Sequence, residues 1–205
     1  TIRDYESIIR NMPPEFGAPA KVSIQEKDNK VEILLLSYDI NGKLISDNSK
    51  YLADNIANYL SNYRMLNDYI VVTSAKVIDV SIDISVVLLA GFSSKDVINN
   101  IITVINNYFS PQKMQLGTNV NLSELKSSIQ TLNGVVAISE MMVKNEVSGD
   151  YSGGETSMQY SDINNKIIQP VDDTIYAQPS EIYHIRYPER DIRVKAKLAT
   201  GMTIG

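Results

Sequence analysis

The sequence contains no cysteine and no tryptophan, and only one of its 205 residues is histidine. Without cysteine there are no disulfides, thiolate metal sites or cysteine nucleophiles. The longest apolar run, near Val86 to Ala90, is far too short to span a bilayer. No signal-peptide pattern is visible and the chain begins at Thr1 rather than Met, so we expect a processed product or a fragment.

The rest of the composition is that of a globular protein. Hydrophobic residues make up 43% and charged residues 21%, and the length allows one large domain or two small ones. The net charge of −5 argues against a nucleic-acid-binding protein. Tyrosine numbers 12 against 3 phenylalanines, a bias that suits half-buried surfaces covered by partners, although compositional drift would explain it as well.

Residues 1–66 are predicted to form a first α+β block. A short helix ends at Pro13 and Pro14, because proline lacks the N–H that a helix needs. Two strands are expected next, and the apolar one over residues 31–36 leads into a turn at Asp39-Ile40-Asn41-Gly42. A long helix is then expected from about Ser46 to about Leu66. Its apolar face would carry Leu52, Ile56, Tyr59, Leu60 and Tyr63.

Residues 67–205 are predicted to form a second α+β block, which begins with a long alternating strand. Ile78, Val80, Ile82, Ile84, Val86 and Leu88 point one way, and Asp79, Ser81, Asp83 and Ser85 the other. Ser93 or Ser94 caps a helix that Pro111 closes, and Asn121 with Glu124 caps a second helix. Asn133-Gly134 turns the chain into a strand over residues 135–143.

The second block is therefore β-α-α-β, then a polar loop over residues 148–178, perhaps with a hairpin, and then a strand over residues 192–198. This order predicts helices on one face of a small sheet. A loop of that length inside a domain is usually functional or disordered. One buried cluster is expected from Ile82, Ile84, Val86, Ile101, Ile105, Leu125, Ile129 and Val136.

The search for chemistry finds no catalytic, cofactor-binding or metal-binding residues. His184 lies among strand formers and no nucleophile-elbow motif is present, so a structural role is expected. Asp39-Ile40-Asn41-Gly42 lacks the further ligands of a calcium loop. Residues 152–156 are glycine-rich but lack the lysine of a phosphate-binding loop. The carboxylate pairs Asp79 with Asp83 and Asp172 with Asp173 suit a hydrolase in principle, but a solvated or salt-paired role is the expectation for Asp79 and Asp83.

Positive charge gathers near the C-terminal end of the chain. The residues concerned are Arg186, Arg190, Arg193, Lys195 and Lys197, the last three on one face of the final strand. Three interpretations are open: an edge strand guarded against aggregation, cross-strand partners for Asp79 and Asp83, or a docking strip for an acidic partner.

A series of landmarks in one order resembles the baseplate J-like family, the wedge components of contractile phage tails. They are Thr1 with Asp4-Tyr5-Glu6, Ala20-Lys21-Val22, Tyr63-Arg64-Met65-Leu66 running into Tyr69-Ile70-Val71-Val72, and Leu116-Gly117-Thr118-Asn119-Val120 followed by Leu132-Asn133-Gly134-Val135. Residues 148–178 do not match the family pattern. Members of the family are longer, so the chain is expected to be a C-terminal part.

The resemblance implies a non-enzymatic structural protein of a bacteriophage virion, made late and assembled in the host cytoplasm into the tail baseplate. It implies self-association as a homodimer or ring, and contacts with other wedge and tail proteins. We expect the self-contact to use the surface of the second block and the polar loop, a region rich in tyrosine at positions 151, 160, 176, 183 and 187. A partner's surface would compensate for ordering this loop, and deletion of residues 148–178 should weaken self-association while the core stays folded. No nucleic acid, membrane, small-molecule substrate, cofactor or metal is implied. The alternatives are a ring component of a related contractile secretion machine or tailocin, a small-ligand-binding α+β domain, and an enzyme whose site lies in a missing part of the chain.

Overall fold

The computed structural model describes residues 2–46, 51–63 and 69–199. Their elements are a mixture of helices and sheets, which confirms the predicted α+β class. Two compact units are present: unit 1 comprises Thr1–Val77, Gln115–Gly117 and Gln178–Ile182, and unit 2 comprises Ile78–Met114, Thr118–Ala177 and Tyr183–Gly205. The division of the chain into a first block of residues 1–66 and a second block of residues 67–205 stays a prediction. None of the described helices has the length and hydropathy needed to cross a membrane.

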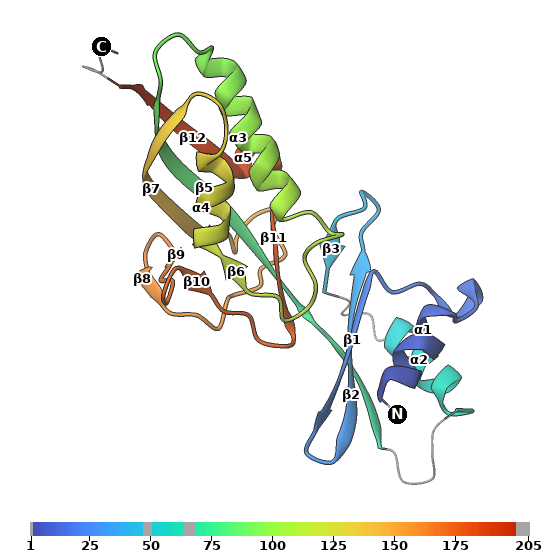
Figure 1. Ribbon diagram of the computed structural model, residues 1–205. Helices are drawn as coiled ribbons and strands as arrows, with labels where there is room; N and C mark the ends of the chain where they lie inside the picture. Colours follow the sequence, from blue (N-terminus) through green and yellow to red (C-terminus); the bar gives the residue numbers. More distant parts are fainter. Residues whose placement is uncertain (1, 47–50, 64–68, 200–205) are drawn as a thin grey trace. The chain divides into compact units, whose positions relative to one another are not determined.

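The sheet of unit 1 is built around β2 (Figure 1). Its strands are β1 (Lys21–Lys27), β2 (Lys30–Tyr38), β3 (Leu44–Ile45) and β4 (Ile70–Ser74). Strands β1 and β2 form an antiparallel hairpin, and its turn residues Asp28 and Asn29 have φ values of 52° and 60°. Two successive positive φ angles are those of a type I′ turn, which matches the twist of a hairpin. β2 also pairs with β3 in antiparallel and with β4 in parallel orientation.

The predicted turn after β2 is confirmed. The Gly42 N–H donates to the Asp39 carbonyl at 3.0 Å, and Gly42 has a φ of 73°. The Asp39 side chain accepts hydrogen bonds from the N–H groups of Asn41 and Lys43, each at 2.8 Å. The carboxylate therefore stabilises a turn, which is the role expected for this motif.

Helices α1 (Ile2–Arg10) and α2 (Tyr51–Leu60) accompany this sheet, with a short 3₁₀ helix, η1 (Pro14–Phe16), after α1. The prediction of a helix from Ser46 to Leu66 is too long, since Ser46 is outside α2 and residues 61–63 form a turn. Residues 47–50 and 64–68 lie outside the described chain. Tyr63 is 51% exposed, because it follows the helix and helical spacing no longer places it on the apolar face. The core of unit 1 consists of Tyr5, Ile9, Met12, Val31, Ile33, Leu35, Leu52, Ile56 and Leu60.

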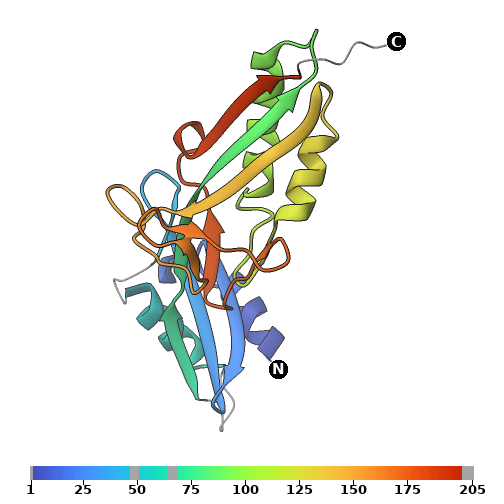
Figure 2. The ribbon, with the colours of Figure 1, turned by 90° about the vertical axis from the view of Figure 1, so that its left-hand side faces the viewer.

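The main sheet of unit 2 has β5 (Lys76–Leu88) as its long strand (Figure 2). β7 (Val135–Asn145) pairs with β5 in antiparallel orientation, and β12 (Ile192–Leu198) pairs with it in parallel orientation. The further strands are β8 (Tyr160–Asp162), β9 (Ile167–Ile168) and β11 (Glu181–His184).

Helices α3 (Ser94–Tyr108) and α4 (Leu122–Gln130) lie on the same side of β5, β7 and β12 (Figures 1 and 2). Both caps occur as predicted. The Ser93 side chain accepts a hydrogen bond from the Asp96 N–H at 3.4 Å, and the Asn121 side chain accepts one from the Glu124 N–H at 3.0 Å. These bonds satisfy N–H groups that have no partner within their helices.

The predicted core cluster is buried with one exception. Ile82, Ile84, Val86, Ile101, Ile105, Leu125 and Ile129 are each at most 1% exposed, whereas Val136 is 40% exposed. Val136 was wrongly predicted because β7 contains β-bulges. Leu88 pairs with Val135 and Val87 with Ala137, so Val136 is an extra residue without a cross-strand partner. An inserted residue interrupts the alternation of inward and outward side chains.

Residues 148–178 contain a hairpin, β8 with β9, and the short strand β10 (Thr174–Ile175). β10 pairs with β6 (Val120–Asn121), which immediately precedes α4. A short helix, α5 (Pro188–Asp191), leads into β12. The segment is thus part of the structure of unit 2 rather than a plain connection.

Candidate functional site

The lone histidine belongs to a buried ionic cluster in unit 2. His184 Nδ1 lies 2.9 Å from Asp79 Oδ1, and Arg186 Nε donates to Asp79 Oδ2 at 2.9 Å. The backbone N–H of Ser152 donates to the same oxygen at 2.7 Å. Asp79 is 0%, Arg186 3% and His184 6% exposed. We refer to these four residues as the Asp79 cluster.

The Asp79 cluster keeps its carboxylate charged. Burial by itself raises the pKa of Asp79, but the hydrogen bonds from His184 and Ser152 and the charge of Arg186 outweigh the effect of burial and hold this pKa below its ordinary value. The solvated role considered for Asp79 is therefore wrong, while the salt-paired role is confirmed. Its partners are Arg186 and His184, not the cations of the last strand that we considered.

A histidine that contacts an aspartate is also found in hydrolytic triads, where a nucleophile binds the second ring nitrogen. Among the described residues, His184 makes its hydrogen bond to Asp79 and to no hydroxyl. Nor do the described residues gather three or more metal-binding side chains in one place. The cluster therefore fixes β5, β11 and the segment that contains Ser152 to one another.

Asn145, at the end of β7, makes a second set of buried contacts. Its side-chain amide donates to the carbonyls of Asp79 at 3.1 Å and Gly154 at 3.0 Å. Its oxygen accepts hydrogen bonds from the Thr156 N–H and the Tyr160 hydroxyl, both at 2.9 Å. Asn145 thus binds the beginning of segment 148–178 to the sheet.

The tyrosines of this region differ in burial: Tyr183 is buried, Tyr151, Tyr160 and Tyr187 are half-buried, and Tyr176 is exposed. Tyr183 is 1% exposed, and its hydroxyl lies 2.7 Å from Thr156 Oγ1, so its predicted place at an interface is wrong. The Tyr151 hydroxyl donates to the buried Asp191 carboxylate at 2.5 Å. Burial and this carboxylate together raise the pKa of Tyr151 to about 12. Tyr176 is 48% exposed and remains available at the surface.

Arg190 lies against the same tyrosines. Its guanidinium carbon is 4.8 Å from the centre of the Tyr151 ring and 4.3 Å from that of Tyr187. The Tyr187 N–H donates to the second oxygen of Asp191 at 2.9 Å. A cation over two aromatic faces, beside a buried carboxylate, stabilises the turn that precedes β12.

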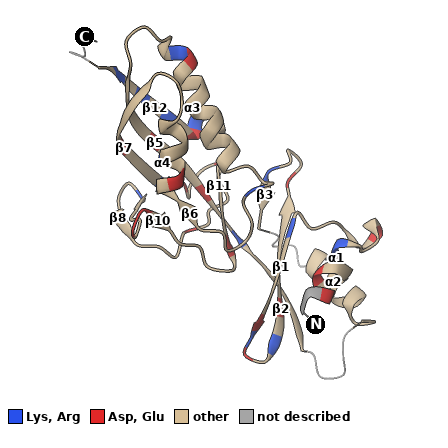
Figure 3. Ribbon diagram, in the orientation of Figure 1, with Lys and Arg blue, Asp and Glu red and all other residues tan. Residues whose placement is uncertain are grey.

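Figure 3 shows the Lys and Arg positions of β12 in blue. The contacts of these cations differ. Arg193 donates to Asp83 at 3.1 Å, in register across the parallel β5–β12 pair, which confirms the cross-strand interpretation for this residue. Lys144 also binds Asp83, at 2.6 Å. Burial raises the pKa of Asp83, but Lys144 and Arg193 outweigh this and lower it. Lys195 and Lys197 are exposed and have no ionic partner among the described residues.

The second carboxylate pair stabilises a turn. Asp172 and Asp173 both have positive φ angles, 49° and 55°. Asp173 accepts hydrogen bonds from Lys126 at 2.8 Å and Ser123 at 3.1 Å, which join the turn to α4. The contacts of Asn145 and Ser152 with Asp79, and of Asp191 with Tyr151, could not be predicted from the sequence, because each joins residues that are far apart along the chain.

Unit 1 contains a pocket of about 340 Å³ between α1 and β1. The loop that joins these elements forms most of its wall, and Gln115 completes it. Apolar residues line one part, while Arg10 and Lys21 supply positive charge. No feature of the sequence predicted this pocket, although Lys21 belongs to one of the landmarks quoted above.

The comparisons with known proteins show a shared fold. No family model matches the chain, and no curated protein matches it by sequence. Seventeen chains of solved structures match. One is a chain in the cryo-EM structure of the anti-feeding prophage (AFP) baseplate, 6-fold symmetrised, with a TM-score of 0.58 and 13% sequence identity. The similarity covers 90% of this chain and 37% of that chain, so this chain spans little more than a third of its structural neighbour.

Proposed function

We propose that this protein is a structural subunit of a contractile-tail baseplate wedge. The observation that carries the proposal is its similarity in fold, over 90% of its length, to a chain of the AFP baseplate. The sequence landmarks support the same assignment independently, because they resemble the baseplate J-like family and, within it, the wedge-ring protein of T-even-type phages. In this proposal the subunit is a component of the virion, located in the tail baseplate.

The proposed subunit works through its interfaces rather than through catalysis. It self-associates, and it joins other wedge proteins into a ring around the central hub. The internal use of polar groups supports this view. The carboxylates of Asp79, Asp83 and Asp191 each bind partners within unit 2 and contribute to its rigidity. A rigid unit transmits a change of position to its neighbours instead of absorbing it.

A second candidate is a ring component of a related contractile particle rather than of a phage tail. The identity of the structural neighbour, an anti-feeding prophage baseplate, favours it. The two candidates share the fold and the mode of action and differ in the particle that contains the subunit. A small-ligand-binding domain is the rival from another class, and the pocket of unit 1 is the observation in its favour.

The test is incorporation into purified contractile particles. Particles are prepared from cells that produce this protein with an affinity tag, and a labelled antibody fragment locates the tag by electron microscopy. We expect label at the baseplate, in copies that follow its rotational symmetry. Removal of the gene should give tails without complete baseplates, and the wild-type gene should restore them. Particles that assemble fully without the protein, or label elsewhere than at the baseplate, would refute the proposal.

A further inference from the structure

β12 forms an edge of the main sheet of unit 2 (Figure 2). It pairs with β5 in register from Ile192 to Leu198, and no other described strand pairs with it. An edge strand presents N–H and C=O groups that have no partner in the sheet, so it is a template for a further strand. With seven residues, β12 is long enough to bind one.

The direction of the backbone groups of β12 follows from one hydrogen bond at its end. The Ala199 N–H donates to the Leu88 carbonyl at 2.9 Å, so it points toward β5. Successive N–H groups of a strand point to opposite sides, and β12 pairs with β5 without a register shift. The N–H groups of Val194, Ala196 and Leu198 therefore point away from β5, toward the free edge.

The side chains of β12 place positive charge on one face of this edge. Lys195 and Lys197 are exposed, and they line a pocket of about 290 Å³ over the sheet. Glu140 belongs to the same lining, but Ser85 lies between it and Lys195, since Ser85 pairs with both residues. Neighbouring strands are about 4.8 Å apart, so roughly 10 Å separates the backbones of Glu140 and Lys195. The two ammonium groups can therefore attract an anion from outside the protein.

The opposite face of β12 is apolar and only partly covered. Val194 is half-buried, Ala196 is exposed and Leu198 is 56% exposed. Side chains of an added strand would lie beside these residues and cover them. The edge thus alternates along the chain between cations on one face and apolar side chains on the other.

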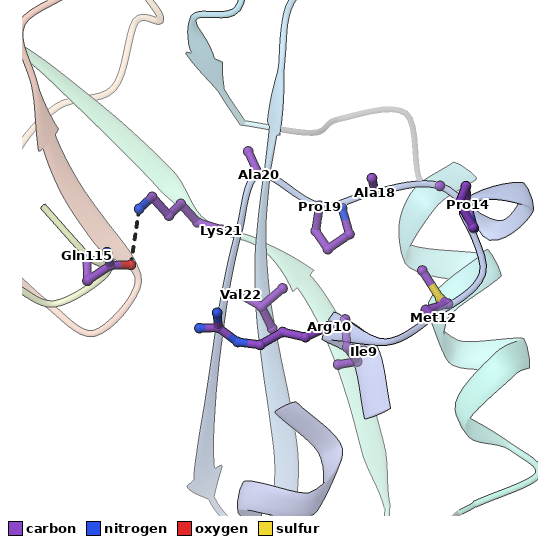
Figure 4. A pocket seen from close by; sticks show the side chains of 11 residues that line it. Ile9, Arg10, Met12, Pro14, Ala18, Pro19, Ala20, Lys21, Val22 and Gln115 are labelled. Atoms are coloured by element: carbon purple, nitrogen blue, oxygen red, sulfur yellow. Dashed lines mark hydrogen bonds between the residues drawn. The ribbon is translucent and has the colours of Figure 1, made fainter. Parts of the chain in front are cut away.

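Basic residues beside the pocket of unit 1 are engaged within that unit, in contrast to those of β12. Lys21 donates to Gln115 Oε1 at 3.1 Å (Figure 4). Arg10 forms an ion pair with Glu6, four residues before it on α1, at 2.7 Å. The two lysines of β12 have no ionic partner in the part of the chain that the structure describes. Positive charge that is available to a partner is therefore found at β12.

We propose that β12 binds an extended segment of a partner protein by strand addition, and that this segment alternates acidic with apolar residues. Its acidic side chains lie beside Lys195 and Lys197, and its apolar side chains lie beside Ala196 and Leu198. This deepens the proposed function, on which it rests, by giving the chemistry of one partner. A strand added to a free edge gains backbone hydrogen bonds, while its alternate side chains supply specificity. Opposite charges at matching positions of neighbouring strands stabilise the pair.

A second copy of β12 is a poor occupant of this edge. An antiparallel pair of β12 strands that continues the sheet has the same face of both strands on one side. Lys195 and Lys197 of one copy then lie beside basic residues of the other copy, and like charges directly opposite are destabilising. Lysines protect an edge against such self-pairing. The same lysines attract an acidic strand, so the charge favours a different protein as the occupant.

The experiment is hydrogen-exchange NMR of the full chain with a synthetic peptide. The probe, acetyl-Thr-Glu-Val-Glu-Val-Glu-Thr-amide, matches β12 in length and carries the proposed alternation. We expect it to slow exchange of the Val194, Ala196 and Leu198 amides at least about tenfold at saturation. The Lys195 and Lys197 amides, which point toward β5, should change little. Binding without protection of the outward amides overturns strand addition.

Two further peptides test the alternation and the charge. Acetyl-Glu-Glu-Glu-Thr-Thr-Val-Val-amide has the same composition without the alternation, and a third peptide carries lysine in place of glutamate. Both should bind at least about tenfold more weakly than the probe. Equal binding of the first would reduce the effect to general attraction between charges and overturn the inference. Tighter binding of a single-stranded oligothymidylate would overturn the assignment to a protein partner.

Charge reversal provides a matched pair of variants. Lys195→Glu with Lys197→Glu should weaken binding of the probe at least about tenfold and favour the lysine peptide instead. Lys27→Glu with Lys113→Glu changes the net charge equally at exposed lysines outside the main sheet of unit 2, and should leave binding of the probe unchanged. Equal weakening in both double variants would overturn the assignment of the site to β12.

Ala196→Pro tests the role of the backbone. Proline removes one outward N–H and none of those that point toward β5, and edge strands accept proline where the N–H faces solvent. We expect this variant to lose binding of the probe while its circular dichroism stays that of the wild type. Retained binding would overturn strand addition. The exchange pattern of the wild type decides the same question whether or not this variant folds.

The outcomes separate this inference from the proposed function. Failure of the probe to bind, or binding that survives the reversal of Lys195 and Lys197, overturns the inference even if the protein is located in baseplates. Alternation-dependent binding by a protein that contractile particles do not contain would instead refute the proposed function and leave the specificity of the β12 edge established.

Discussion

At the scale of single residues, Asp79 combines full burial with three hydrogen-bonding partners. Its lowered pKa means that the folded protein binds fewer protons at acidic pH than the unfolded chain does. The stability from Asp79 is therefore fully present above the unfolded pKa, about 3.9, and is lost as pH falls through the lower pKa of the folded state. The loss begins near pH 4 and continues below it.

Asp79→Asn should reduce the free energy of unfolding by about 3–5 kcal/mol at pH 7, because it leaves the buried Arg186 without its counter-charge. Urea unfolding measures this, and the difference from wild type should shrink below about pH 4. The matched control is Asp83→Asn, a more exposed carboxylate, which should cost about 1 kcal/mol or less. Equal costs for the two variants would show that the Asp79 cluster gives no special stability.

Ile84 and Val136 form a second test at this scale. Both were predicted to be buried, but Ile84 is 1% exposed and Val136 is 40% exposed. Ile84→Ala should cost about 2–5 kcal/mol, since it leaves a cavity in the core. Val136→Ala should change stability by about 0.5 kcal/mol or less. Thermal and urea unfolding of both variants measure the difference, and a large effect of Val136→Ala would argue against the bulge in β7.

At the scale of elements, segment 148–178 depends on Asn145. We expected a partner protein to offset the free-energy cost of ordering so polar a segment. At the beginning of the segment, contacts within unit 2 offset this cost instead. Asn145 contacts Gly154 and Thr156 while it also binds the backbone of β5. Removing one buried amide therefore leaves several polar groups without partners, each at a cost of about 1–3 kcal/mol.

Asn145→Ala should release this segment locally. We expect the Thr156 amide, which donates to Asn145, to exchange with solvent at least about tenfold faster in hydrogen-exchange NMR. Ser161→Ala, in the exposed hairpin of the same segment, should leave that rate unchanged. If the Thr156 amide keeps its protection in Asn145→Ala, then other contacts hold the segment and our account of Asn145 is wrong.

The elements that sequence reasoning identified are those with local causes. The caps at Ser93 and Asn121 and the turn at Asp39 each depend on side chains within four residues, so their patterns are readable. The bulge at Val136 was not readable, because it arises from the pairing of β7 with β5. The burial of Asp79 was missed for the same reason, since its cover comes from Ser152 and Arg186.

At the scale of the whole molecule, deletion of residues 148–178 is no longer a clean test of assembly. We expected this deletion to weaken self-association and leave the core folded. It would remove Ser152 and Thr156. Polar groups that bind them would then be exposed to water or left without these hydrogen-bond partners, namely those of Asp79, Asn145 and Tyr183. Loss of association would then follow from unfolding of unit 2 as readily as from loss of an interface.

Point substitutions on the surface of this segment give the sharper prediction. Ile163 is 69% exposed and Val171 is 51% exposed, and apolar side chains so exposed suit an interface. We expect wild type to form a homodimer or larger ring that buries more than roughly 1,000 Å². Ile163→Ser with Val171→Ser should lower the mass measured by light scattering at equal concentration. Ile40→Ser, fully exposed at the turn after β2, is the control that should keep the wild-type mass. A wild-type monomer at high concentration, or equal dissociation of the control, would exclude an assembly surface on this segment.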